Sequence, residues 1–126
     1  MILKTKTMVR LLVLIGSILV TIPSFATTIF SAGFDSAINE FDVDGNLLNS
    51  HNVGFNAGTM DYNPLNDTLF FGFYSGPSAL RGIWSMDGDG SNLTRIFNAS
   101  SINRSLTIDY VNGFVFSDFD GSEGLV

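Results

Sequence analysis

The chain has 126 residues, with 12 Asp and Glu, six Lys and Arg, one His and no Cys, and a formal net charge of −6 at pH 7. This length allows one domain, and the lack of cysteine excludes a disulfide framework, a cysteine nucleophile and a Cys/His zinc site. The negative charge argues against nucleic acid as a partner, because phosphate neutralisation needs clustered Lys and Arg.

Residues 1–26 predict a secretory signal peptide. Basic residues precede an almost wholly apolar stretch, 11–22, and Pro23 and small residues follow it. The stretch is shorter than the roughly 20 apolar residues that span a bilayer, so we expect cleavage after Ala26 rather than a membrane anchor. The exported part, 27–126, has 12 acids and three arginines, a formal charge of −9. We therefore expect a secreted protein, extracellular or periplasmic.

The exported part predicts an all-β domain. It contains 11 of the 12 Phe and 12 of the 13 Gly, a mixture of short aromatic runs and turn residues, and it lacks a sustained helical period. In chain order, strands are expected at 28–34, 37–41, 47–53, from 59 into 61–62, at 69–73, 82–86, 93–97, from 106 into 109–110, and at 114–117.

An internal repeat groups these strands. Residues 38–46 align with 83–91 at an offset of 45, and residues 69–74 align with 114–119 at the same offset. A period of about 45 residues is typical of a four-stranded propeller blade. The sequence thus predicts a β-propeller architecture.

A family resemblance supports this architecture. Residues 83–93 are similar to the segment that ends in Leu-Asp-Gly-Ser-Asn in the YWTD-repeat β-propellers of the low-density-lipoprotein-receptor type. Residues 106–118 continue the likeness, with Val-Phe-Ser-Asp at 115–118 where that family has Tyr-Trp-Thr-Asp. The resemblance implies an exported scaffold that presents loops to a protein or glycan ligand.

The strand count predicts a partial ring. Residues 28–53 supply three strands, residues 59–98 a complete blade and residues 106–119 two further strands, whereas propellers close with 4 to 8 blades. We expect the chain to be the N-terminal piece of a longer reading frame, with about two blades and the start of a third. Missing blades or self-association would then cover its open faces and edges.

Two acidic turns are candidate calcium sites. Asp42 and Asp44 in one turn, and Asp87 and Asp89 in the other, place carboxylates at alternate positions, as a hard cation requires. Neither turn has the Gly at position six or the Glu at position twelve of an EF-hand loop. Polar turns are therefore the favoured interpretation, calcium is the alternative, and no other cofactor is expected.

Asp61 and Asp109 are candidates for a ligand channel. They align in the repeat, and polar groups on the inner strands of a propeller line its central channel. The favoured interpretation is structural: each carboxylate accepts backbone N–H bonds where an inner strand ends. His51, the only histidine, is expected to be a solvated surface residue, and no residue is assigned a catalytic role.

Other side chains have two interpretations each. We expect most of the aromatic set to form core between blades, with carbohydrate stacking as the alternative. This set is Phe70, Phe71, Phe73, Trp84, Phe114 and Phe116. Four Asn-x-Ser/Thr sequons, which would carry glycans in a eukaryotic source, begin at Asn66, Asn92, Asn98 and Asn103.

Two functions from different classes remain open. The first is a non-enzymatic scaffold for protein or glycan binding. The second is an exported propeller hydrolase or lyase of the lactonase type, with a metal held near the central axis by acidic and Asn ligands. The sequence favours the first, because the ordinary composition of polar turns explains all of its acidic clusters. A propeller fold does not decide between the two functions.

Overall fold

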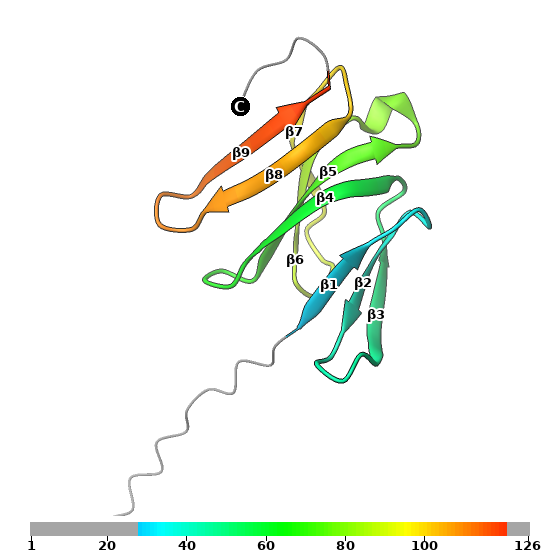
Figure 1. Ribbon diagram of the computed structural model, residues 1–126, viewed down its shortest axis with the longest axis vertical. Coiled ribbons are helices and arrows are strands. Elements are labelled where there is room, and N and C mark those ends of the chain that lie inside the picture. Colours follow the sequence, from blue (N-terminus) through cyan, green and yellow to red (C-terminus); the bar gives the residue numbers. More distant parts are fainter. Residues whose placement is uncertain (1–27, 121–126) are drawn as a thin grey trace, which may run out of the picture.

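The computed structural model describes residues 28–120, which form nine β-strands in three antiparallel sheets (Figure 1). The one helical element in this part of the chain is a short 3₁₀ turn, Ser78–Leu80. The all-β prediction is therefore confirmed. The predicted signal peptide, residues 1–26, lies outside the described residues. Within residues 28–120, no helix is long and apolar enough to cross a membrane.

The strands occur where the sequence predicts them. The first sheet contains β1 (Ile29–Ala32), β2 (Ala37–Phe41) and β3 (Leu47–Asn52), in that order. The second sheet contains β4 (Asn56–Asn63), β5 (Thr68–Ser75), β6 (Gly82–Asp87) and β7 (Thr94–Asn98). The third sheet contains β8 (Asn103–Asp109) and β9 (Phe114–Phe119).

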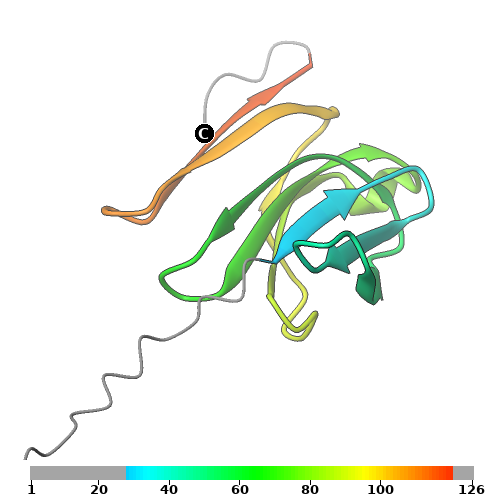
Figure 2. The ribbon, with the colours of Figure 1, turned by 60° about the horizontal axis from the view of Figure 1, so that its bottom comes forward.

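The second sheet lies between the other two (Figures 1 and 2). Its face toward the first sheet forms the main core, in which Phe71 and Phe73 are 0% and 2% exposed. Full burial of a side chain of this size stabilises the fold by about 1.5–3 kcal/mol. The buried members of this core are Ile38, Val53, Phe55, Ala57, Leu69, Phe71, Phe73 and Met86.

The opposite face of the second sheet packs on the third sheet. Gly72 lies on this face, and a Cβ atom added there would overlap the side chain of Asn103 in β8. The rings of Phe97 in β7 and Phe119 in β9 lie 5.5 Å apart across the same junction. Each face of the second sheet is thus covered by a neighbour.

The repeat between the first and second sheets has the predicted offset of 45. The turn after β2 is closed by a bond from the Gly45 amide to the Asp42 carbonyl, and the turn after β6 by the same bond from Gly90 to Asp87. Gly45 and Gly90 have φ of 83° and 84°, a left-handed conformation that glycine adopts without steric cost. The two turns are equivalent.

The predicted alignment of the second sheet with the third is wrong by one or two residues. The loop between β4 and β5 is closed by the pair Asn63 and Thr68, and the loop between β8 and β9 by Asp109 and Phe114. These pairs differ by 46, so Asp109 corresponds to Asn63 and not to Asp61. Because side chains alternate across a strand, a one-residue slip transfers every side chain to the other face.

This register explains why two of the predicted core aromatics are exposed. Phe116 corresponds to Phe70, on the face of the second sheet that the third sheet covers, and Phe114 shares its face. In residues 28–120 no further sheet covers this face of the third sheet, and Phe114 and Phe116 are 61% and 45% exposed. The expectation that most of the aromatic set forms core therefore does not extend to these two side chains in this part of the chain.

Candidate functional site

Asp61 ties the second sheet to the third. Its Oδ2 accepts hydrogen bonds from the Ile108 amide at 2.9 Å and from the Thr107 hydroxyl at 3.2 Å. Its Oδ1 accepts a hydrogen bond from the Tyr110 hydroxyl at 2.9 Å. This bond stabilises the protonated phenol and raises the pKa of Tyr110. The carboxylate thus joins β4, the first strand of its sheet, to β8, the first strand of the next.

Asp109 has the structural role that the sequence favours. Its Oδ1 accepts hydrogen bonds from the amides of Val111 at 3.0 Å and Asn112 at 3.2 Å. Its Oδ2 accepts one from Nδ2 of Asn112 at 2.7 Å. The side-chain bond from Asn112, together with these amide bonds, lowers the pKa of the carboxyl. Asp109 therefore stabilises the turn after β8, and binding of a channel ligand by Asp61 and Asp109 stays a prediction.

A buried asparagine, which the sequence did not single out except as a sequon, completes the junction between these sheets. Asn103 is 1% exposed, and its Oδ1 accepts a hydrogen bond from the Thr59 hydroxyl in β4. Its Nδ2 donates to the carbonyls of Ser105 at 2.9 Å and Asp118 at 3.1 Å, and to the Ser117 hydroxyl. Gly72 leaves room for this side chain. Without the strand register, nothing in the sequence separates Asn103 from the other turn asparagines.

In the first acidic turn, Asp42 binds its own turn. Its Oδ1 accepts hydrogen bonds from the amides of Asp44 at 2.9 Å and Asn46 at 2.8 Å, and its Oδ2 accepts Nδ2 of Asn46 at 2.8 Å. The bond from the Asn46 side chain is the main cause of the lowered pKa of Asp42. These oxygens hold the turn together, as the polar-turn interpretation requires.

The second acidic turn is built in the same way. Asp87 Oδ2 accepts Nδ2 of Asn92 at 2.7 Å, and Asp89 Oδ1 accepts the Ser91 amide at 2.8 Å. Hydrogen bonds from Ser91 lower the pKa of Asp89. Among residues 28–120, no group of three or more His, Asp or Glu side chains is placed to hold a metal ion. Calcium binding at these two turns stays a prediction.

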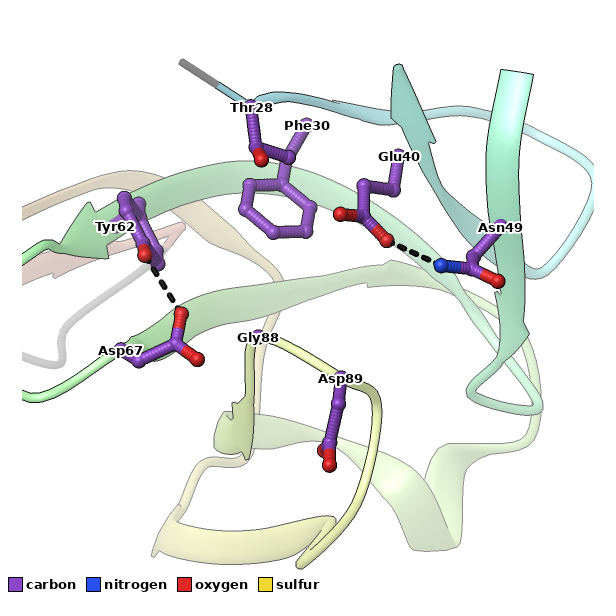
Figure 3. Close-up of a pocket in the computed structure, with 8 residues that line it drawn as sticks. All are labelled: Thr28, Phe30, Glu40, Asn49, Tyr62, Asp67, Gly88 and Asp89. Atoms are coloured by element: carbon purple, nitrogen blue, oxygen red, sulfur yellow. Dashed lines mark hydrogen bonds between the residues drawn. The ribbon is translucent and has the colours of Figure 1, made fainter. Parts of the chain in front are cut away.

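A pocket of about 360 Å³ opens between the first two sheets (Figure 3). Two hydrogen bonds hold its walls: the Tyr62 hydroxyl donates to Asp67 at 2.6 Å, and Asn49 Nδ2 donates to Glu40 at 2.6 Å. The bond to Asp67 is the main cause that raises the pKa of Tyr62 to about 12. The lining residues are Thr28, Phe30, Glu40, Asn49, Tyr62, Asp67, Gly88 and Asp89. Three carboxylates give the pocket a negative charge.

His51 does not lie in solvent, contrary to the prediction. It is on β3, its side chain is only 14% exposed, and its Nε2 lies 3.9 Å from a Glu40 oxygen. A Cβ atom on Gly90 would overlap the imidazole ring, so the turn after β6 covers His51. The sequence places His51 on an outer strand correctly, but it does not show that the second sheet's turn folds over that strand.

The structure brings the predicted polar residues to separate places and not to one centre. Asp61 lies at the junction of the second and third sheets, Asp89 lines the pocket beside the first sheet, and Asp42 binds its own turn. The pocket and the Asn103 network are the features that sequence reasoning missed.

No protein-family model matches the chain, and a search of curated proteins finds no match to it.

Proposed function

We propose that the chain is an exported binding scaffold of the β-propeller type. The observation that carries this proposal is the serial packing of three antiparallel sheets in chain order, with β4 and β8, the first strands of their sheets, side by side. The 45-residue offset of the equivalent turns and the likeness to YWTD repeats support it. In such a scaffold, the sheets hold the turns rigidly and the turns bind the partner.

The use of the carboxylates supports binding rather than catalysis. A general acid or base must have an oxygen free to reach the reacting atom. The carboxylates of Asp42, Asp87 and Asp109 accept hydrogen bonds within their own turns, and that of Asp61 joins two sheets. These oxygens are used for structure. The alternative, a metal-assisted hydrolase or lyase, lacks an observation in its favour within residues 28–120.

In this proposal the turns around the pocket supply the binding surface. The pocket is lined by residues of both the first and second sheets, including Asp67 in the turn between β4 and β5 and Asp89 in the turn after β6 (Figure 3). Its walls combine aromatic rings with charged and amide groups, a composition typical of binding sites. The negative charge favours a neutral or cationic protein or glycan surface.

A binding experiment with a matched pair of variants tests this function. The secreted protein is applied to glycan and peptide arrays, together with Asp89→Lys and with Asp44→Lys, which changes the equivalent turn of the first sheet away from the pocket. We expect array binding that Asp89→Lys reduces at least tenfold and Asp44→Lys leaves unchanged. Absence of array binding, or equal loss in both variants, contradicts a binding surface at the pocket.

Calcium calorimetry separates the two function classes. The scaffold predicts no saturable heat when the secreted protein is titrated with calcium chloride. Saturable binding that Asp87→Asn abolishes would overturn the assignment of Asp87 to the turn alone and would favour the metal-assisted alternative.

A further inference from the structure

Within residues 28–120, no sheet covers either outer face of the stack, and both faces carry exposed apolar side chains. The first-sheet end face consists of Ile29, Phe41 and Leu47, and the third-sheet end face consists of Thr107, Phe114 and Phe116. From the geometry of these faces we infer that copies of this chain associate head to tail, the third-sheet end face of one copy packing on the first-sheet end face of the next.

The first-sheet end face repeats a surface that is buried inside the molecule. Ile29 pairs with Phe41, and Phe41 pairs with Leu47, so the three side chains form one row across the sheet. Phe41 corresponds to Met86 at the offset of 45, and the row therefore corresponds to Leu69 and Met86 in the second sheet. Leu69 and Met86 are 0% and 1% exposed beneath the first sheet, whereas Ile29 and Leu47 are 49% and 58% exposed.

The third-sheet end face repeats the other buried surface of the second sheet. Phe116 pairs with Thr107 as Phe70 pairs with Asp61, and at the offset of 46 these pairs are equivalent. Phe70 is partly buried on the face that the third sheet covers, with Gly72 in contact range of Asn103. Phe116 occupies the same place one sheet later and has no sheet over it among residues 28–120.

The two end faces are therefore the two halves of the junction that already occurs twice within the chain. The second sheet packs on the third sheet through the face that carries Phe70, and on the first sheet through the face that carries Leu69. Each internal junction therefore joins a Phe70-type face of one sheet to a Leu69-type face of the sheet that follows it in the chain. Joining the end faces of two copies continues the same order of sheets. Such an interface uses different surfaces on the two copies and is heterologous. This inference depends on the sheet packing alone and does not depend on the proposed binding function.

Mixing two complementary variants tests the interface. The secreted form of the protein is purified, and mass spectrometry identifies the cleavage site at its N-terminus. One variant carries Phe114→Thr and Phe116→Thr, and the other carries Ile29→Thr and Leu47→Thr; threonine keeps the strand propensity while removing apolar area. The control carries Val43→Thr and Leu65→Thr, two exposed turn residues outside both faces.

Sedimentation velocity over a range of concentrations gives the outcome. We expect the wild type and the control to associate with increasing concentration, and each face variant to associate at least tenfold more weakly. Because each face variant retains the face that the other lacks, an equimolar mixture should form a 1:1 dimer that neither forms alone. Self-association of one face variant as strong as that of the wild type would show a contact between identical faces and overturn the inference.

A measurement on the unmodified protein guards against misfolding of the variants. Amide hydrogen exchange is compared at low and high concentrations of the wild type. We expect protection to increase with concentration in β1 and β9 and not in β5, which both neighbours already cover. A monomeric wild type at all concentrations, or protection that increases elsewhere, contradicts head-to-tail association.

Discussion

Replacement of Asp61 with alanine should loosen the junction between the second and third sheets. The carboxylate accepts three hydrogen bonds from β8 and the turn that follows it, from the Thr107 hydroxyl, the Ile108 amide and the Tyr110 hydroxyl. In Asp61→Ala all three donors lose their acceptor, and no other side chain of β4 is bonded to this stretch of β8.

The expected loss follows from the burial of the donors. Ile108 is 8% exposed, so its amide loses an acceptor at a site where water has limited access, which costs about 1–3 kcal/mol. The hydroxyls of Thr107 and Tyr110 belong to exposed residues and can bond to water, so they add little. We therefore expect a loss of about 2 kcal/mol in the free energy of unfolding. For a domain of this size that corresponds to a fall in Tm of about 10 °C.

Thermal unfolding by circular dichroism measures this loss, with Asp120→Ala as the control. Asp120 forms an ion pair with Arg104 at 2.8 Å between two exposed side chains, a kind of pair that contributes little to stability because water screens both charges. Amide exchange at Ile108 should accelerate about 30-fold in Asp61→Ala, since 1.4 kcal/mol is a factor of about ten. Equal Tm values for the two variants, with slow exchange retained at Ile108, would refute the role assigned to Asp61.

Three further predictions follow from the same contacts. Gly72→Ala places a Cβ atom against Asn103 and should destabilise the fold by about 1–3 kcal/mol in urea unfolding; a fully stable variant would contradict the close packing of β5 on β8. In a phenolate absorbance titration, Tyr62 should ionise near its raised pKa of about 12 and return toward 10 in Asp67→Asn. Because the pKa is raised in the folded state, the stability from this bond is present below pH of about 10 and lost as pH rises through about 12; an unchanged titration in Asp67→Asn would contradict the bond. In a eukaryotic secretory host, glycopeptide mass spectrometry should find glycans at exposed sequons such as Asn66 but none on Asn103, which is buried; a glycan on Asn103 would contradict its place in the network.

The strands were predictable because their signals are local. Aromatic and β-branched runs separated by Gly, Asn and Asp turns define each strand from its own residues. The offset of 45 between the acidic turns was also readable, since Gly45 and Gly90 occupy equivalent left-handed positions. The same local logic correctly assigned Asp109 to its turn.

The features that the sequence predicted wrongly or missed depend on contacts between sheets. Sequence similarity suggested that Asp109 in the third sheet is equivalent to Asp61 in the second. The residue pairs that close the two hairpin loops show that Asp109 is instead equivalent to Asn63. His51 was predicted to be solvated because an isolated outer strand is solvated, whereas the turn at Gly90 covers it. Asn103 is buried only because Gly72 lies opposite. None of these facts is local to the residue concerned.

The serial packing of the sheets depends most on the placement of β8 beside β4, the first strands of neighbouring sheets. The chain has no cysteine, so a single introduced pair reports this contact without competition. Thr59→Cys with Asn103→Cys replaces a β4 side chain and a β8 side chain that share a hydrogen bond between the facing surfaces of the two sheets. We predict that mild oxidation of the secreted protein forms an intramolecular disulfide in this variant and none when Val43→Cys replaces Thr59→Cys. Failure of the first pair to close, or equal closure of both, would contradict the serial packing of the three sheets.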